Sequence, residues 1–150
     1  MIKRLLLFIT INFVALAIGG LFTPNGISSE WYQTLNKAPW TPPGWFFGLA
    51  WTTIMICLSL FMAYALKKKN QTLTLFYSVQ LFLNVIWTPT FFYYQKPLLG
   101  LFFIVLLTIL IGGIIVKYTK EYRRLVFLLV PYFIWLCIAT SLNLYIIAFN

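Results

Sequence analysis

The sequence predicts an all-α integral membrane protein, a single bundle of five transmembrane helices formed by residues 1–150. Hydrophobic residues make up 62% of the chain and charged residues 9%, whereas an average soluble domain has about 45–50% and about 25%. The apolar residues fall into five long runs without a charged residue. Basic residues gather in short clusters between these runs, which is the charge pattern of membrane proteins.

A helix that crosses a membrane requires about 20 mainly apolar residues, because lipid offers no partner for broken backbone hydrogen bonds. Each run is about this long. The first run follows Lys3-Arg4 like a secretory signal, but it exceeds the usual core of about 7–15 residues, so we expect a retained helix. The five expected helices cover residues 5–22, 45–66, 73–93, 98–116 and 125–149.

The connections between these helices set the orientation. Those at 67–72, 94–97 and 117–124 are short and predict antiparallel neighbours. If the helices alternate, nine basic residues share one side, and only Lys37 and Lys96 lie on the other. The positive-inside rule then predicts a multi-pass protein of the cell membrane with a cytoplasmic N-terminus, an outer loop at 23–44 and a C-terminus outside.

Several classes of function are disfavoured by composition. The chain has no histidine, and Glu30 and Glu121 are its only acids, so we expect no metal site, no catalytic triad and no required cofactor. Cys57 and Cys137 lie inside apolar runs, as small buried hydrophobes do. Isolated basic clusters do not form the continuous surface that nucleic acid requires. An ion channel or transporter usually shows intramembrane charges, and these runs have none.

Polar and aromatic side chains recur at helical spacing inside the runs, so they form one stripe per helix. The stripes are Asn12, Ala15 and Gly19; Trp51, Met55 and Met62; Gln80, Asn84, Trp87 and Phe91; and Tyr132, Trp135, Ala139 and Asn143. Counted by helical rise, Trp51, Trp87 and Asn143 share one layer below the outer surface, with Asn84 slightly deeper. The layer suits a flat, mostly apolar ligand; alternatively, its polar groups only hydrogen-bond between helices.

The outer loop lies directly over this layer and contains much of the chain's tryptophan. Four of the six tryptophans fall within residues 31–51. Pro39, Pro42 and Pro43 restrict the loop backbone, so it can hold a definite shape as a lid. Its aromatic underside would consist of Trp31, Tyr32 and Trp40. Within the bundle, Pro89 and Pro131 should bend their helices.

At these positions the chain resembles the translocator protein or tryptophan-rich sensory protein family over essentially its whole length. The matching residues are Trp31-Tyr32, Leu35, Lys37, Trp40 and Pro42-Pro43; Gln80-Leu81, Leu83-Asn84, Trp87, Pro89 and Phe91-Phe92; and Pro131-Tyr132, Trp135, Thr140 and Leu142-Asn143. The resemblance implies a five-helix membrane protein, usually a dimer, that binds porphyrins and similar flat apolar molecules beneath the first loop. It points to Tyr32, Pro42, Trp51, Asn84, Trp87 and Trp135 as ligand-binding residues.

Two functions remain open at this point. The first is a sensor or carrier of porphyrin such as protoporphyrin IX, with Lys37 pairing with a propionate. The second is an enzyme that degrades protoporphyrin with light and oxygen, as some bacterial members of the family are reported to do, with Trp51 and Trp135 as catalytic residues. The expected partners are the ligand, the lipid bilayer and a second copy of the chain, for which Gly112-Gly113 permit close helix contact.

Overall fold

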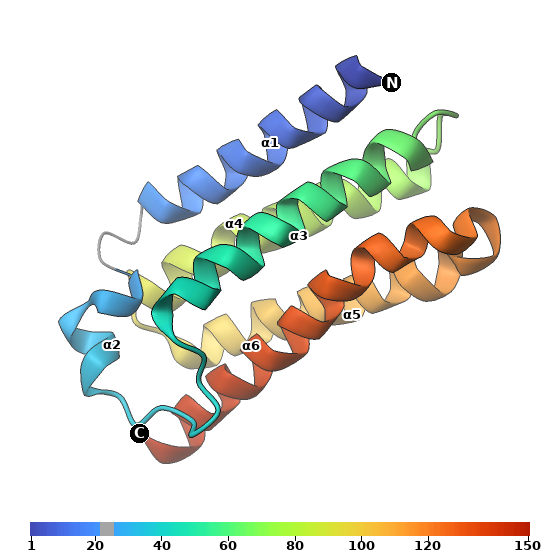
Figure 1. Cartoon of the computed structure of the whole chain (residues 1–150). Coiled ribbons are helices and arrows are strands. Elements are labelled where there is room, and N and C mark those ends of the chain that lie inside the picture. Colours follow the sequence, from blue (N-terminus) through green and yellow to red (C-terminus); the bar gives the residue numbers. More distant parts are fainter. Residues whose placement is uncertain (22–25) are drawn as a thin grey trace.

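The computed structural model describes the whole chain except residues 22–25, and the described residues form helices and connections without a strand. Five long helices run along one axis, and a short helix, α2, covers one end (Figure 1). The elements are α1 (Ile2–Leu21), η1 (Gly26–Ser28), α2 (Glu30–Thr34), α3 (Gly44–Ala65), α4 (Gln71–Phe92), α5 (Pro97–Tyr122), η2 (Arg123–Leu129) and α6 (Val130–Phe149), where η marks a 3-10 helix.

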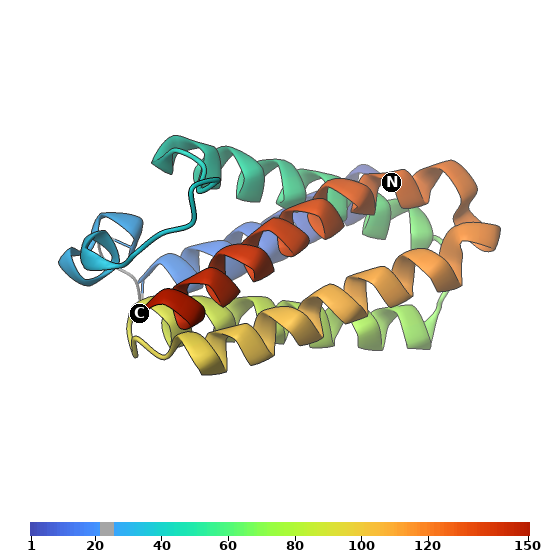
Figure 2. The same ribbon diagram turned by 90° about the horizontal axis from the view of Figure 1, so that it is seen from below.

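The long helices form a ring in the order α1, α3, α6, α5, α4, as the contacts between them show. Figure 2 shows the ring from below, with α4 and α5 on one side and α3 on the other. By length and apolar composition, four helical segments of the described chain can cross a membrane, beginning at Ile2, Gly44, Gln71 and Pro97. The last of them extends to Phe149 and contains α5, η2 and α6. The protein is therefore a helical membrane protein.

Each expected helix has a counterpart, but two boundaries were wrong. The fourth helix continues through the charged residues to Tyr122, because leaving the apolar core does not itself end a helix. The fifth begins as the 3-10 stretch Arg123–Leu129 and becomes α-helical at Val130. Pro131 thus lies in the first turn of α6, where its missing N–H removes no hydrogen bond, instead of bending the helix from within.

The predicted stripes face the interior. Asn12, Ala15 and Gly19 are the buried positions of α1 together with Phe8. The α4 members Gln80, Asn84 and Phe91 are buried, as are all four members on α6. The periodicity of polar residues therefore identified the inward face of these helices correctly.

A closed polar network joins three helices at the level of Asn12. The Asn12 amide donates to Ser59 Oγ at 2.8 Å, and the Tyr77 hydroxyl donates to Asn12 Oδ1 at 2.8 Å. Ser59 Oγ donates in turn to the carbonyl of Met55 at 2.6 Å. The network links α1, α3 and α4, so Asn12 holds these helices together by hydrogen bonds.

Glycines on α5 let α4 and α6 approach closely. A Cβ on Gly100 would lie 3.2 Å from both Phe91 and Asn143, and one on Gly112 would lie 3.0 Å from Phe133. Gly113 differs, since a Cβ there would meet no described atom within 4 Å. Gly112 therefore serves packing within the chain, and only Gly113 is open to a partner. A homodimer remains a prediction.

The two ends of the bundle differ in charge. The N-terminus, the α3–α4 connection and the α5–η2 junction share one end, which we call the basic end (Figure 1). The lid end holds α2, the α4–α5 connection and the C-terminus. The nine basic residues assigned to one side all belong to the basic end, whereas Lys37 and Lys96 belong to the lid end.

Candidate ligand cavity

A cavity of about 240 Å³ lies between α1, α3 and α4 at the lid end, next to η1. Its surface is mainly apolar and aromatic, with Asn84 and Thr88 as its polar side chains. The residues that line it are Ala15, Leu16, Gly19, Gly20, Gly26, Ile27, Gly44, Phe47, Gly48, Trp51, Asn84, Trp87, Thr88 and Phe92. Three of the six predicted ligand-binding residues, Trp51, Asn84 and Trp87, are among them.

Indole and phenyl rings make one wall of the cavity. The Trp51 and Trp87 rings lie 6.3 Å apart between centroids. Trp87 also stacks on Phe91 at 5.8 Å with an interplanar angle of 21°, and it meets Phe92 edge-on at 6.2 Å. Contacts of this kind hold large flat side chains in fixed orientations, so the wall presents flat apolar surface from α3 and α4.

Trp135 belongs to the same aromatic cluster but lies behind Trp51. Its ring centroid is 6.4 Å from that of Trp51 and 5.3 Å from that of Phe47. It is only 4% exposed. It does not line the cavity; it lines a separate apolar groove between α3 and α6. Trp135 can therefore act on a ligand in this cavity only through Trp51 and Phe47, unless the site enlarges.

Polar groups next to the cavity are only partly satisfied. The Asn84 amide donates to the Tyr132 hydroxyl at 2.8 Å, and that hydroxyl donates to Gln80 Oε1 at 3.2 Å. Gln80 Nε2, Trp87 Nε1 and Trp135 Nε1 are buried without a hydrogen-bond acceptor among the described residues. A buried donor without a partner costs about 1–3 kcal/mol. Of the three side chains only Trp87 lines the cavity, and because its N–H is buried, a ligand would reach this donor only if the site enlarges.

The lid segment, residues 26–43, packs onto the end of α4. The Ser29 side chain caps α2 by accepting from the backbone N–H of Tyr32 at 3.3 Å. This cap helps to fix α2, which carries Tyr32 to within 5.6 Å of Phe92 between ring centroids. Trp31 meets Phe91 edge-on at 5.6 Å. The lid aromatics thus cover the rings behind the cavity wall, and Phe92 connects them to the cavity.

Charge and ionisation in the lid concern Lys37 and Tyr32. Lys37 Nζ donates to the carbonyls of Tyr32 and Gln33 at 3.2 and 3.3 Å and lies 5.1 Å from the Tyr32 ring centroid. Its ammonium is thus held by acceptors that an anionic group can replace. The Tyr32 hydroxyl is neutral near pH 7 like that of any tyrosine, and burial raises its pKa further, so it can donate a hydrogen bond.

Trp40 does not face the cavity, contrary to the prediction. The residue is 55% exposed, its Nε1 donates to Ser141 Oγ at 3.1 Å, and its ring centroid lies 5.5 Å from that of Tyr145. The extended segment after α2 crosses to α6, which carries Trp40 away from α4. Pro42 is half-buried on the same segment and does not line the cavity.

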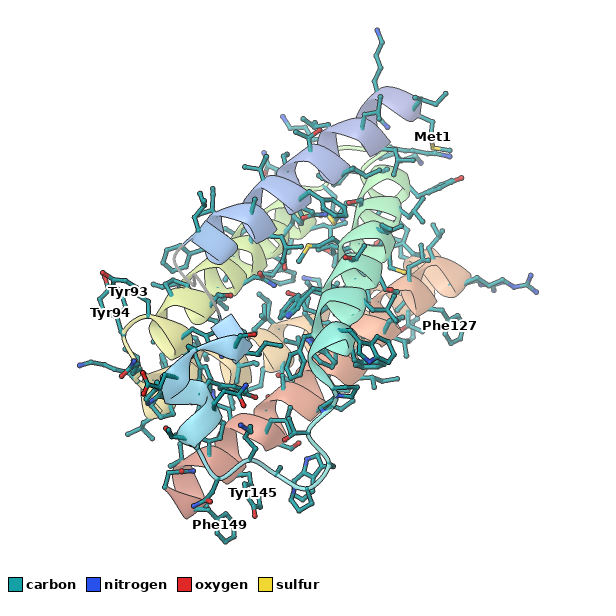
Figure 3. All side chains as sticks on the ribbon, turned by 60° about the vertical axis from the view of Figure 1, so that its left-hand side comes forward. Met1, Tyr93, Tyr94, Phe127, Tyr145 and Phe149 are labelled. Carbon is teal, nitrogen blue, oxygen red and sulfur yellow. The ribbon has the colours of Figure 1, made fainter. Side chains whose placement is uncertain are left out.

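The C-terminus fastens this part of the lid. The backbone N–H of Asn36 donates to Asn150 Oδ1 at 2.8 Å, and the Asn36 amide donates to the carbonyl of Phe149 at 3.1 Å. The Asn150 amide donates back to the carbonyl of Asn36 at 3.2 Å. Figure 3 shows Tyr145 and Phe149 at this end of α6. The lid is therefore attached at two places, on α4 and on α6.

Asn143 was wrongly placed in the ligand layer. With its amide oriented to satisfy both groups, it donates to the carbonyl of Pro97 at 2.9 Å and accepts from the backbone N–H of Leu101 at 3.1 Å. Asn143 thus joins α6 to the first turn of α5, where Gly100 leaves room for it. Its burial comes from a structural contact that α6 alone does not reveal.

The cavity residues Phe47, Gly48 and Thr88 were not predicted from the sequence. Gly48 lies one turn before Trp51 on α3, and Thr88 directly follows Trp87, so their proximity to the tryptophans was the available signal. Among the described residues, no group of three or more His, Cys, Asp or Glu side chains could hold a metal ion.

Fold and cavity together define a helical membrane protein with a tryptophan-lined cavity next to the lid segment. The chain belongs to the TspO/MBR family, whose model matches residues 8–149. It is 37% identical to the tryptophan-rich protein TspO of Chlorobaculum tepidum, over 88% of this chain and 86% of that protein. It is 35% identical to the tryptophan-rich sensory protein of Cereibacter sphaeroides (83% and 77% covered) and 33% identical to the translocator protein of Ovis aries (79% and 73%).

Proposed function

We propose that this protein binds protoporphyrin IX, or a similar flat apolar molecule, next to the lid segment and acts as a sensor or carrier. The observation that carries the proposal is the cavity itself, in which the Trp51 and Trp87 rings and Asn84 converge from two helices. Apolar aromatic walls with a few orienting polar groups are typical of ligand sites. The relatives named sensory protein and translocator protein support this class of function.

The cavity must enlarge to accept a porphyrin. Its volume of about 240 Å³ is below the lower limit of about 300 Å³ for sites of drug-sized ligands. The lid segment is the part most suited to move, because its attachments to α6 are exposed hydrogen bonds of Asn36. Movement of the lid would also free Lys37 to pair with a propionate and would bring Tyr32 and Pro42 within reach of a larger ligand, whereas Trp135 would contact a ligand only if Trp51 also moved.

The test is a titration of the purified protein with protoporphyrin IX in darkness, in which binding is measured by the quenching of tryptophan fluorescence. We expect saturable quenching in the micromolar range. Trp87→Phe should weaken binding by about 1–2 kcal/mol, since it removes the unpaired indole N–H beside the ring wall. Trp45→Phe is the matched control, because Trp45 is 69% exposed and lies outside the cavity. Quenching that never saturates would rule out the site.

Light-dependent degradation of the porphyrin is the second candidate function, and the row of indoles favours it. Trp87, Trp51 and Trp135 follow one another at 6.3 and 6.4 Å between centroids. An indole beside a photoexcited porphyrin can give it one electron. Dioxygen, the oxidant, would then add to the reduced ring, and the adduct would return one electron to the indole radical, so that the net change is oxygenation of the porphyrin. Trp51 and Trp135 would then be the residues that carry the reaction.

Phenylalanine substitutions separate the two functions. Trp51→Phe and Trp135→Phe keep most of the ring contact but remove the oxidisable indole, so binding should weaken by no more than about 1–3 kcal/mol. Porphyrin loss under illumination in air should slow much more than binding weakens. If both variants bleach porphyrin at the parent rate, these residues are not the electron donors; if the parent causes no bleaching, only the sensor or carrier function remains.

We further propose that α1, α3, α4, α5 and α6 each cross the membrane once, with the basic end in the cytoplasm. The excess of nine bases over two at the opposite end supports this orientation. A reporter active only outside the cytoplasm, fused after Asn150, should be active. Activity of a reporter that works only in the cytoplasm, fused at the same place, would show that the orientation is the reverse.

A further inference from the structure

A second apolar groove lies at the basic end, between the end of α5 and the start of α6. It has a volume of about 340 Å³ and is far from the candidate cavity, which is at the lid end. Ile115, Val126, Phe127 and Val130 provide its apolar surface. The Phe127 ring is 72% exposed and points away from the bundle in Figure 3. The groove is therefore open on the outer surface of the bundle.

Two arginines complete the lining of this groove. Arg123 and Arg124 are both exposed, and both line it. Arg123 has φ +41° and ψ −110°, a backbone conformation that suits glycine and that other residues rarely adopt. It stands at the junction of α5 and η2, where its backbone N–H bonds to the carbonyl of Thr119. Arg123 therefore occupies a position at which glycine would adopt the same backbone conformation with less strain.

The charge around the groove is strongly positive. The basic end holds nine lysines and arginines, and Glu121 is its only carboxylate, because Glu30 lies in α2 at the lid end. A single acid cannot neutralise this excess. The two arginines are therefore available to an anion.

We propose that this groove binds an anionic phospholipid. The phosphate would pair with Arg123 and Arg124, since the planar guanidinium forms two parallel hydrogen bonds to phosphate oxygens. An acyl chain would lie along Ile115, Phe127 and Val130. Basic pockets between membrane helices bind anionic headgroups in this way. A soluble phosphate compound fits less well, because four of the lining side chains are apolar. A zwitterionic lipid also fits less well, because the cation beside its phosphate would be repelled by the two arginines.

The test measures thermal unfolding of the purified protein in neutral detergent while dioleoyl phosphatidylglycerol is added. We expect a saturable rise of the unfolding temperature of roughly 5 °C or more, and a much smaller rise with dioleoyl phosphatidylcholine. The variant with Arg123→Gln and Arg124→Gln should lose the extra rise. The control with Lys68→Gln and Lys69→Gln removes the same charge at the same end and should keep it.

Further variants make the test decisive. Arg123→Gly removes the charge but suits the backbone, so the lipid-free protein should be at least as stable as the parent while the effect of phosphatidylglycerol falls by half or more. Ile115→Trp fills the apolar part and should raise the lipid concentration at half-effect at least threefold. Protoporphyrin binding should be unchanged in every variant, which separates this site from the cavity.

Three results would overturn the proposal. One is an equal effect of the two lipids on the parent. Another is an equal loss in the arginine and lysine pairs, which would indicate general charge attraction. The third is the same stabilisation by glycerol 3-phosphate, which would indicate a site for soluble anions. If the double arginine variant does not fold, Arg123→Gly decides by itself.

Discussion

Packing differs between the α5 side of the bundle and the cavity side. On α5, a Cβ added to Gly100 would come within 3.2 Å of Phe91 and Asn143. On α3, a Cβ added to Gly48 would meet no described atom within 4 Å. The same residue type therefore has opposite roles: Gly100 lets two helices come together, and Gly48 keeps a space open. One side serves stability, and the other retains room for a ligand.

Polar groups show the same contrast along α4. Near the basic end, Tyr77, Asn12 and Ser59 form a network in which each side chain has a partner. Nearer the cavity, Asn84 and Tyr132 are paired, but Gln80 Nε2 keeps an unused donor. The complete network holds three helices together, whereas the Gln80 donor is buried without a partner and would gain one only if the site enlarges as far as Gln80.

Substitution of Gly100 should have the largest effect on stability. Gly100→Leu forces a side chain into the contact with Phe91 and displaces the Asn143 amide, so the free energy of unfolding should fall by about 1–3 kcal/mol. Thermal unfolding in detergent measures this. Gly113→Leu on the same helix is the control and should leave stability nearly unchanged, because its Cβ meets open space. Equal effects of the two changes would remove the distinction between the sides.

Filling the cavity should abolish tight binding without loss of the fold. Gly48→Leu places a side chain in free space beside Trp51, so protoporphyrin affinity should fall at least about tenfold, or about 1.4 kcal/mol. The unfolding temperature should not decrease, because glycine is a poor residue for a helix interior. Fluorescence titration and thermal unfolding test the two parts. Unchanged affinity would mean that the porphyrin binds elsewhere.

Substitution of Asn12 should lower stability more than porphyrin affinity, and substitution of Asn84 should do the opposite. Asn12→Ala leaves Tyr77 and Ser59 without their partner and should lower the free energy of unfolding by about 1–2 kcal/mol, with porphyrin affinity unchanged. Asn84→Ala should weaken porphyrin binding by about 1 kcal/mol and affect stability less, because Tyr132 still donates to Gln80. Both variants are compared in the same titration and melting experiments. A loss of affinity with Asn12→Ala would contradict the division.

Loosening the lid should give the smallest effect. Asn36→Ala removes an exposed side-chain bond to α6, and porphyrin should dissociate about twofold faster, equivalent to about 0.4 kcal/mol. Stopped-flow release measures the rate. Asn150→Ala removes different bonds, those from its side chain to the backbone of Asn36, so the double variant should release porphyrin faster than either single variant. A double variant no faster than the single variants would show that one of these bonds is enough to hold the lid.

Much of the fold follows from local features of the chain. The length of the apolar runs predicted the long helices, because lipid requires complete backbone hydrogen bonding over about 20 residues. Helical periodicity identified the inward stripes, Asn12 to Gly19 and Gln80 to Phe91 among them. The sorting of bases between the two ends also follows from the order of runs and clusters. Each feature is contained within one helix or one connection.

The site depended on how the helices are placed around the ring. A stripe says which face of a helix points inward, but not which neighbour it meets. Asn143 therefore joins α5, and Trp135 lies behind Trp51. Trp40 lies on α6 because the C-terminal residues hold the lid there, more than a hundred residues away in sequence. Only the packed bundle decides such contacts, since they depend on the rotation and spacing of several helices together.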